Sequence, residues 1–186
     1  MKFLKHKNLT IIFDFLESSE VSAFDFFMKT NTWGKAEGDP HWSMNISSAE
    51  IGLIAQTIQK RLKNTIETVY QCTLSNETLG TLVKYRVGQG LKRHYDAALI
   101  EETTGKMTVC QTFSGHPRRD ISSTVYLGQS FEGGEIYFPN IDFTYEPVQG
   151  SVIIFPSSEE YEHEVTPVVS GDRIMASIFW YKFNDI

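Results

Sequence analysis

The strongest constraint on the fold is a change of pattern near Leu79, where helix-forming sequence gives way to short strands and turns. From there on, β-branched and aromatic residues gather in short runs, and Gly-containing pairs mark the turns between the runs. About eight strands are expected: Leu79–Val87, Arg93–Ala98, Lys106–Phe113, Ile121–Leu127, Glu135–Phe138, Ser151–Phe155, Tyr161–Val165 and Arg173–Phe183. This pattern predicts a mainly β (α+β) fold, a jelly roll or double-stranded β-helix, supported by N-terminal helices.

The N-terminal part predicts one strand and two helices. Leu9–Leu16 has strand character, and a helix capped by Ser18 or Ser19 should follow it, with one apolar side: Val21, Phe24, Phe27 and Met28. Asn31–Ser43 is rich in Gly, Asp and Pro and is expected to be a loop. A second helix should begin at the capping box Ser47–Glu50, because an apolar stripe at steps of three or four residues follows it: Ile51, Ile54, Ile58, Leu62, Ile66 and Val69.

Chain length and composition favour one soluble domain. The 186 residues, 41% of them hydrophobic, suit a single domain over 1–186, with a helical supporting region at 1–78 and a jelly-roll core at 79–186. No apolar run is long enough to span a membrane, so the predicted location is the cytoplasm. The net charge of -6 argues against binding nucleic acid through the whole surface. Cys72 and Cys110 have no metal-binding or redox spacing, so both are expected to be ordinary thiols.

A candidate metal site comes from His94-Tyr95-Asp96 and the distant His163. In a strand, His94 and Asp96 would face the same side, with Tyr95 packing outward. Two histidines and one carboxylate form the facial triad of mononuclear non-haem Fe(II) centres. A lone His-x-Asp is usually accidental, so the interpretation depends on whether other residues of the chain support a metal site.

Arg173 gives such support, because it could bind an acidic cosubstrate beside the metal. The segment from His163 to Arg173 predicts a strand, a Gly-Asp turn and a second strand, which would return Arg173 to the metal side. An arginine binds a carboxylate through two parallel hydrogen bonds and stays charged when buried, so it suits an acidic cosubstrate. The alternative is a surface arginine on an edge strand.

Several ordered motifs resemble the prolyl 4-hydroxylase-type 2-oxoglutarate/Fe(II) dioxygenases. Tyr85 to Asp96 is similar to the family's Tyr-x-x-Gly-Gln…His-x-Asp segment, and Gly133-Gly134-Glu135 is similar to its Gly-Gly-Glu turn. The Gly150–Pro156 strand also fits, and His163 to Arg173 resembles the His…Pro-Val…Gly-x-Arg stretch of the bacterial, PKHD-type branch. The resemblance covers about Tyr85 to Tyr181.

By this resemblance, His94, Asp96 and His163 bind Fe(II), and Arg173 pairs with the far carboxylate of 2-oxoglutarate. Tyr85 helps to hold that carboxylate, and Ser122 is a further hydroxyl donor in the family's pattern. The alternatives are a packing tyrosine and a serine within the strand ladder. Gly133, Gly134 and Glu135 are expected to shape a turn.

The implied reaction uses Fe(II), O2 and 2-oxoglutarate, with ascorbate as an optional reductant, and hydroxylates an unactivated C–H bond. The leading substrate by family likeness is a prolyl residue in a peptide or protein, followed by other amino-acid side chains or free amino acids. Because Asp96 is not Gly or Ala, no position is open for chloride, which argues against a halogenase.

The loops Asn31–Ser43 and Leu99–Arg118 are expected to cover the cavity, because long connections at a barrel mouth usually carry specificity. Trp33, Trp42, Arg118 and Arg119 are candidate substrate contacts or simple surface residues, whereas Phe179 and Trp180 should pack the barrel. Two other functions stay open: a nucleic-acid oxidative demethylase, supported only by Arg118-Arg119, and a non-catalytic jelly-roll binding module. The sequence does not indicate an oligomeric state.

Overall fold

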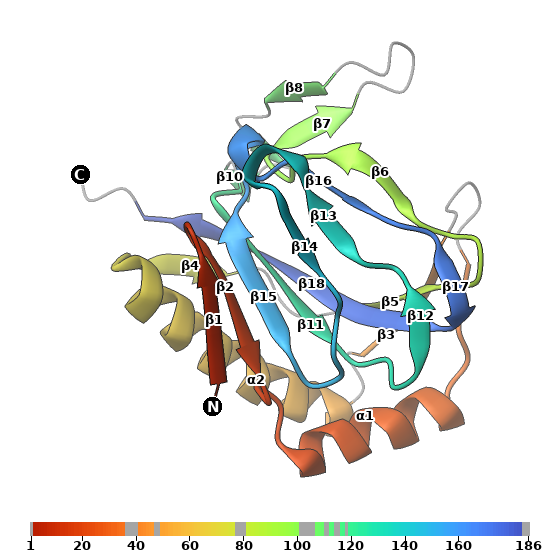
Figure 1. Ribbon diagram of the computed structural model, residues 1–186. Coiled ribbons are helices and arrows are strands. Elements are labelled where there is room, and N and C mark those ends of the chain that lie inside the picture. Colours follow the sequence, from red (N-terminus) through yellow and green to blue (C-terminus); the bar gives the residue numbers. More distant parts are fainter. Residues whose placement is uncertain are drawn as a thin grey trace.

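The computed structural model describes residues 2–35, 41–46, 49–76, 81–100, 107–109, 112–113, 116–117 and 119–183. Two β-sheets face each other in a jelly roll (Figure 1). The major sheet has the order β1-β2-β15-β11-β18-β5-β3, with β4 added beside β18. Its strands are β1 (Lys2–His6), β2 (Leu9–Phe13), β3 (Trp42–Asn45), β4 (Leu74–Asn76), β5 (Thr81–Tyr85), β11 (Ile121–Tyr126), β15 (Val152–Pro156) and β18 (Arg173–Lys182).

The minor sheet has the order β14-β13-β16-β6 and holds one part of the candidate site. Its strands are β6 (Leu91–His94), β13 (Ile136–Phe138), β14 (Phe143–Tyr145) and β16 (His163–Val165). Three two-stranded pairs complete the described strands: β12 (Phe131–Gly133) with β17 (Val168–Gly171), β7 (Ala98–Ile100) with β8 (Met107–Val109), and β9 (Thr112–Phe113) with β10 (His116–Pro117). Two short 3-10 helices are η1 (Pro139–Ile141) and η2 (Glu159–Tyr161). The predicted jelly roll is therefore confirmed.

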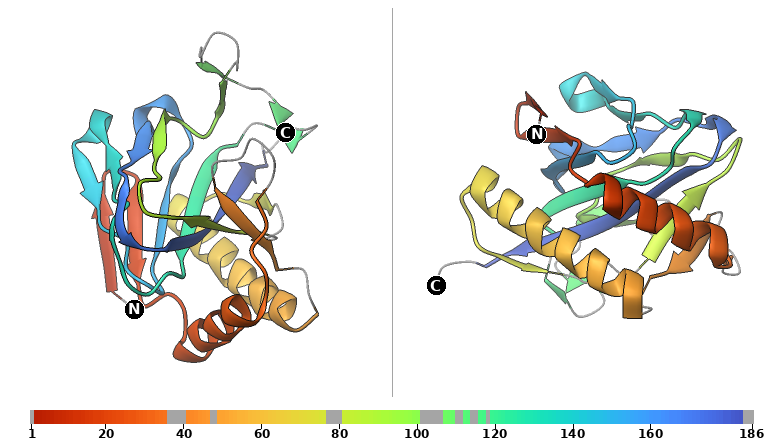
Figure 2. Two further views of the ribbon diagram at one scale, coloured as in Figure 1. Left: turned by 90° about the vertical axis from the view of Figure 1, so that its right-hand side faces the viewer. Right: turned by 90° about the horizontal axis from the view of Figure 1, so that it is seen from below.

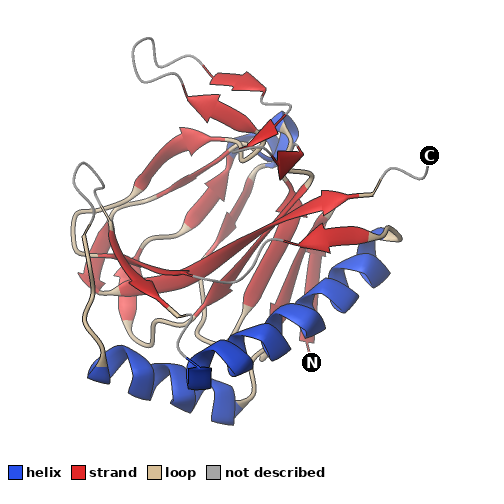
Figure 3. Ribbon diagram, turned by 180° about the vertical axis from the view of Figure 1, so that it is seen from behind, coloured by secondary structure: helices blue, strands red, loops and turns tan. Residues whose placement is uncertain are grey.

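Two helices, α1 (Ser18–Thr30) and α2 (Ala49–Tyr70), cover the outer face of the major sheet (Figures 2 and 3). Most of the apolar stripe predicted for α2 packs in or against the core below it: Ile51, Ile54, Ile58, Leu62 and Ile66. Val69 is only partly buried and is not part of this core. The predicted cap of α1 is wrong by one or two residues: Glu17 is the N-cap, and it exchanges reciprocal hydrogen bonds with Glu20. The predicted capping serines of α2, Ser47 and Ser48, lie outside the described residues.

The major sheet separates two hydrophobic cores. One lies between the sheet and the helices and includes Phe24, Leu62 and Trp180. The other lies between the two sheets and includes Tyr126, Phe138 and Phe155. The second core surrounds the candidate site. The site therefore lies between the two sheets, on the face of the major sheet opposite the helices.

The N-terminal region contributes more than helical support. Four strands, β1 to β4, join the major sheet, and β3 begins within the predicted loop Asn31–Ser43. The short strands at sheet edges depend on their partners, and the local sequence gives little signal for them. Among the described residues, no helix is long and apolar enough to cross a membrane.

The predicted strand Arg93–Ala98 is also corrected. β6 ends at His94, and a turn follows in which the backbone N–H of Ala98 donates to Tyr95 O at 3.1 Å. The backbone N–H of Ala97 donates to Ser157 O at 3.0 Å, which anchors this turn to the end of β15. Asp96 is therefore presented by a turn, and Tyr95 is buried and not turned outward.

Candidate metal and cosubstrate site

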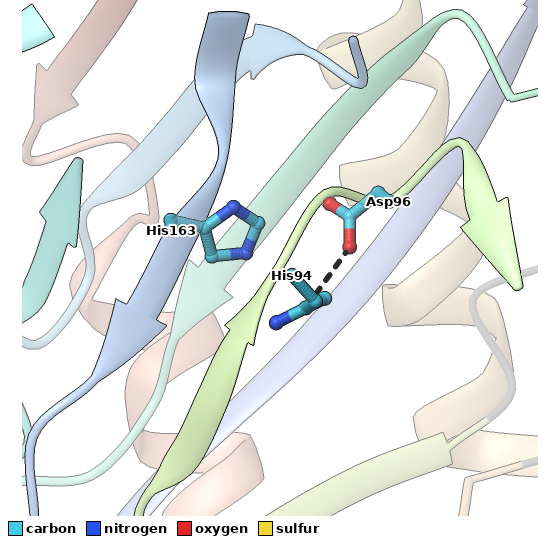
Figure 4. A group of neighbouring side chains, drawn as sticks. All are labelled: His94, Asp96 and His163. Atoms are coloured by element: carbon cyan, nitrogen blue, oxygen red, sulfur yellow. Dashed lines mark ion pairs between the residues drawn. The ribbon is translucent and has the colours of Figure 1, made fainter. Parts of the chain in front are cut away.

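The structure brings together the side chains of His94, Asp96 and His163 (Figure 4). β6 and β16 pair antiparallel, with His163 directly opposite His94, and the turn after β6 adds Asp96. One potential ligand atom from each residue lies within 4.8 Å of the other two, and His94 Nε2 is 3.4 Å from Asp96 Oδ1. Two imidazoles and one carboxylate at this spacing fit a single metal ion.

Both imidazole rings are oriented by backbone carbonyls. His94 Nδ1 lies 2.7 Å from Lys92 O, and His163 Nδ1 lies 3.0 Å from Tyr161 O. Since a carbonyl only accepts, each Nδ1 carries a proton. His163 Nε2 then keeps its lone pair for a metal ion, whereas His94 Nε2, which pairs with Asp96, must release its proton before it can bind one. The two rings have their centroids 4.4 Å apart, and Phe138 and Phe155 pack against His163.

The three groups also couple electrostatically. Burial alone raises the pKa of the Asp96 carboxyl, but His163, His94 and a hydrogen bond from Ser122 together hold this pKa well below its usual range. Burial lowers the pKa of His163, and the nearby Asp96 offsets only part of this effect. Burial also lowers the pKa of His94, but its hydrogen bond to Asp96 and the charge of Asp96 raise the pKa overall. An ionised carboxylate beside a neutral buried imidazole is the state that binds a divalent metal.

Arg173 begins β18 directly opposite Tyr85 of β5 and is 1% exposed. Its Nε donates to Gly134 O at 2.9 Å, and its guanidinium lies 5.0 and 5.2 Å from the ring centroids of Tyr85 and Tyr126. Nη2 reaches the Tyr126 hydroxyl at 3.5 Å, and Nη1 has no hydrogen-bond partner among the described residues. A buried cation with a free donor suits an anionic guest, because an unpaired buried charge is costly.

A cavity of about 340 Å³ connects the triad with Arg173. Its lining includes His94, Asp96, His163, Tyr85 and Arg173, five of the six residues singled out from the sequence. Several other residues of the lining are apolar or aromatic: Val83, Leu91, Ile136, Phe155, Val165 and Met175.

The sixth residue, Ser122, lies elsewhere. It is buried, does not line the cavity, and its Oγ is 2.7 Å from Ser157 Oγ and hydrogen-bonded to Asp96. The cavity instead has Thr124 and Ser177, whose hydroxyls are 3.0 Å apart. The structure therefore places the Ser122 hydroxyl against Asp96 and Ser157, outside the lining of the cavity.

Tyr126 and the contact between Gly134 and Arg173 were missed by the sequence reasoning. The alternation of side chains along β11 could have indicated Tyr126, because Thr124 and Tyr126 lie two residues apart and therefore share the face of the strand that lines the cavity. Nothing in the local sequence indicated that the Gly134 carbonyl would accept from Arg173, since that contact joins residues far apart in the chain.

Of the candidate substrate contacts that the structure describes, one lines the cavity and two do not. Arg119 lines the cavity and stacks over Phe179, with its guanidinium carbon 3.6 Å from the ring centroid. Trp33 and Trp42 do not line it: Lys84 lies over the ring of Trp33, and Arg86 lies over that of Trp42. Trp180 packs in the helix-side core and not inside the barrel, and it donates from Nε1 to Ser123 Oγ, whereas Phe179 lines the cavity. Arg118 and much of the loop Leu99–Arg118 lie outside the described residues.

A jelly roll that holds two histidines and a carboxylate around one point is the arrangement of mononuclear non-haem iron oxygenases. The chain belongs to the 2OG-Fe(II) oxygenase superfamily, whose family model matches residues 80–182. The family resemblance inferred from the motifs is thereby confirmed.

Curated relatives and solved structures agree with this membership. A PKHD-type hydroxylase of Nitrosomonas eutropha is 40% identical over 70 residues (35% of this chain and 30% of the relative). One from Sphingopyxis alaskensis is 30% identical over 102 residues (53% and 41%). The matches thus span 30% to 41% of the length of these relatives.

Two prolyl hydroxylases have the same fold over nearly the whole chain. The viral collagen prolyl hydroxylase of Paramecium Bursaria Chlorella virus-1 superposes with a TM-score of 0.67 and 21% identity, covering 96% of this chain and 97% of the other. A Pseudomonas putida prolyl-4-hydroxylase gives a TM-score of 0.69 and 19% identity, with 97% and 95% covered. At these identities the likeness shows the fold.

Proposed function

We propose that this protein is a 2-oxoglutarate- and Fe(II)-dependent dioxygenase that hydroxylates an unactivated C–H bond, with a prolyl residue of a peptide or protein as the leading substrate. One observation carries the proposal: two histidines, a carboxylate and a buried arginine with a free donor line the same cavity. The prolyl substrate is supported by the likeness to prolyl hydroxylase folds.

In this proposal His94, Asp96 and His163 hold Fe(II), which with O2 and 2-oxoglutarate supplies the oxidising chemistry. Arg173 binds the far carboxylate of 2-oxoglutarate through its two outer nitrogens, and the Tyr85 hydroxyl helps to hold that carboxylate. The rings of Tyr85 and Tyr126 lie 5.0 and 5.2 Å from the guanidinium and support it. The apolar walls keep water from the reacting carbon. Arg119, which lines the same cavity, is a candidate contact for the peptide.

Anaerobic titration of the protein with Fe(II) and then 2-oxoglutarate tests the reaction class. A weak visible charge-transfer band is expected when a 2-oxo acid chelates iron at an open facial site. His94→Ala, Asp96→Ala and His163→Ala should each abolish the band and the release of succinate in air. If all three variants keep both, the assignment of the triad is wrong.

Arg173→Ala provides the second test. It should raise the 2-oxoglutarate concentration needed for half-saturation by on the order of tenfold to a hundredfold, because a charge-assisted bidentate contact is lost. Metal affinity should stay close to that of the wild type. An unchanged 2-oxoglutarate requirement would show that Arg173 does not bind the cosubstrate. The substrate is tested separately, by screening proline-containing peptides for hydroxylation.

A further inference from the structure

Gly134 stands directly behind Arg173. It follows β12 in the turn toward β13, with a φ of +67° that L-residues rarely adopt. A Cβ built at this position would lie 2.7 Å from Arg173 Cδ and 3.4 Å from Arg173 Nε. Because the Gly134 carbonyl also accepts from Nε at 2.9 Å, the arginine side chain rests on bare backbone with no room for a methyl group.

On its other sides, Arg173 is held by the two tyrosines and faces the cavity. Arg173, Tyr85 and Tyr126 line that cavity, and Gly134 does not. An arginine that is pushed off Gly134 therefore has free space in one direction, toward the triad. At about 340 Å³, the cavity is near the lower end of the range for small-molecule sites. A small shift of the Arg173 guanidinium therefore changes the length of the molecule that fits between it and the triad.

We propose that the absence of a side chain at Gly134 sets the depth of this cavity and so selects 2-oxoglutarate over oxaloacetate, the 2-oxo diacid shorter by one methylene. This inference rests on the proposed function, since it assumes that Arg173 receives the far carboxylate. Gly134 acts through Arg173 and is a positioning residue. Gly134→Ala should move the guanidinium toward the metal and leave too little length for 2-oxoglutarate.

The test is calorimetric titration of the Mn(II)-loaded wild type and Gly134→Ala with 2-oxoglutarate and with freshly dissolved oxaloacetate. A one-methylene difference in a fitted pocket corresponds to about tenfold or more in discrimination. We expect the variant to lose about tenfold in 2-oxoglutarate affinity while it keeps or gains affinity for oxaloacetate. A purely structural effect would weaken both ligands together.

Gly88→Ala is the matched control, because Gly88 has a φ of +83° and nothing within 4 Å of a built Cβ. It imposes similar backbone strain without touching Arg173, so its ratio of the two affinities should equal that of the wild type. Thermal unfolding checks that each variant is folded. If Gly134→Ala does not fold, Gly134→Asn places the same Cβ with a residue that accepts left-handed φ more readily.

The outcomes separate the two proposals. A wild-type protein that binds neither diacid overturns the proposed function and this inference with it. A wild type that binds 2-oxoglutarate, together with a Gly134 variant whose ratio of affinities is unchanged, overturns the inference alone.

Discussion

Ser122 lies at the point where the proposed ligand Asp96 is held in place. Its hydroxyl hydrogen-bonds to Asp96 and to Ser157 Oγ, and it does not reach the cavity lining. Groups that orient a metal-binding carboxylate typically account for tenfold to a hundredfold in metal affinity. The position of Ser122 therefore favours a role toward the metal end of the site, whereas the family resemblance placed it at the cosubstrate.

Ser122→Ala distinguishes these two roles. We expect metal affinity to fall about tenfold, with the 2-oxoglutarate affinity of the metal-saturated protein within about twofold of the wild type. Competition against a metal chelator and calorimetry measure the two quantities. Ser123→Ala is the control, since its hydroxyl faces the other core and accepts from Trp180 Nε1 at 2.8 Å. If only the 2-oxoglutarate affinity falls, Ser122 acts in cosubstrate binding and not in orienting the metal ligand.

Tyr126 gives a prediction about alkaline stability. Burial raises the pKa of its phenol from 10.0 to about 12, although the charge of Arg173 acts in the opposite direction. Since the folded pKa is above the unfolded value, the stability from the neutral phenol is complete below pH 10.0 and is lost as pH rises through about 12. In that window the unfolding free energy of the wild type should fall faster than that of Tyr126→Phe by about 1.4 kcal/mol per pH unit. Urea unfolding measures both slopes, and parallel slopes would contradict the burial of this phenol.

At the scale of elements, the predictable part of the fold is the part with a local signal. The apolar stripe of α2 and the long strand β18 were visible in the sequence because each repeats over several turns or pleats. β1 was not, because its basic, exposed residues become a strand only by pairing with β2. The site was predictable for a different reason: His94, Asp96, His163 and Arg173 stand within ordered motifs, whereas the contact that backs Arg173 depends on tertiary packing.

Arg61 of α2 forms ion pairs with two glutamates at the start of α1, a short one with Glu20 and one of 3.8 Å with Glu17. Arg61 Nη2 donates to Glu20 Oε2 at 2.6 Å and to Phe15 O at 3.2 Å, and Glu20 also caps the start of α1. Glu20→Ala should lower the unfolding free energy by about 2–3 kcal/mol, because it removes the bond from Arg61 and the cap bond from Glu17 N–H, and leaves the partly buried Arg61 with Phe15 O and the longer contact to Glu17. Urea unfolding measures the loss, and metal affinity should not change.

Glu160→Ala is the control for this pair. Glu160 pairs with Lys7 at 3.9 Å, and their side chains are 56% and 50% exposed, so its removal should cost less than about 0.5 kcal/mol. Equal losses in the two variants would show that the contact between α1 and α2 contributes no more than a surface pair.

For the whole molecule, the candidate site bridges the two sheets of the jelly roll. The triad stands on β6, β16 and the turn after β6, whereas Arg173 and Tyr85 stand on β18 and β5 of the major sheet. A metal ion and a diacid bound together would therefore link the sheets.

Ligand binding should accordingly stabilise the fold as a unit. At a hundred times the dissociation constant, a ligand that binds only the folded state adds about 2.7 kcal/mol. For a domain of this size that corresponds to a rise of about 5–10 °C in Tm for each ligand, measured by calorimetry with Mn(II) alone and with Mn(II) and 2-oxoglutarate together. His163→Ala should lose the whole shift, and Arg173→Ala should keep only the part due to the metal. An undiminished shift in His163→Ala would place the binding site elsewhere in the molecule.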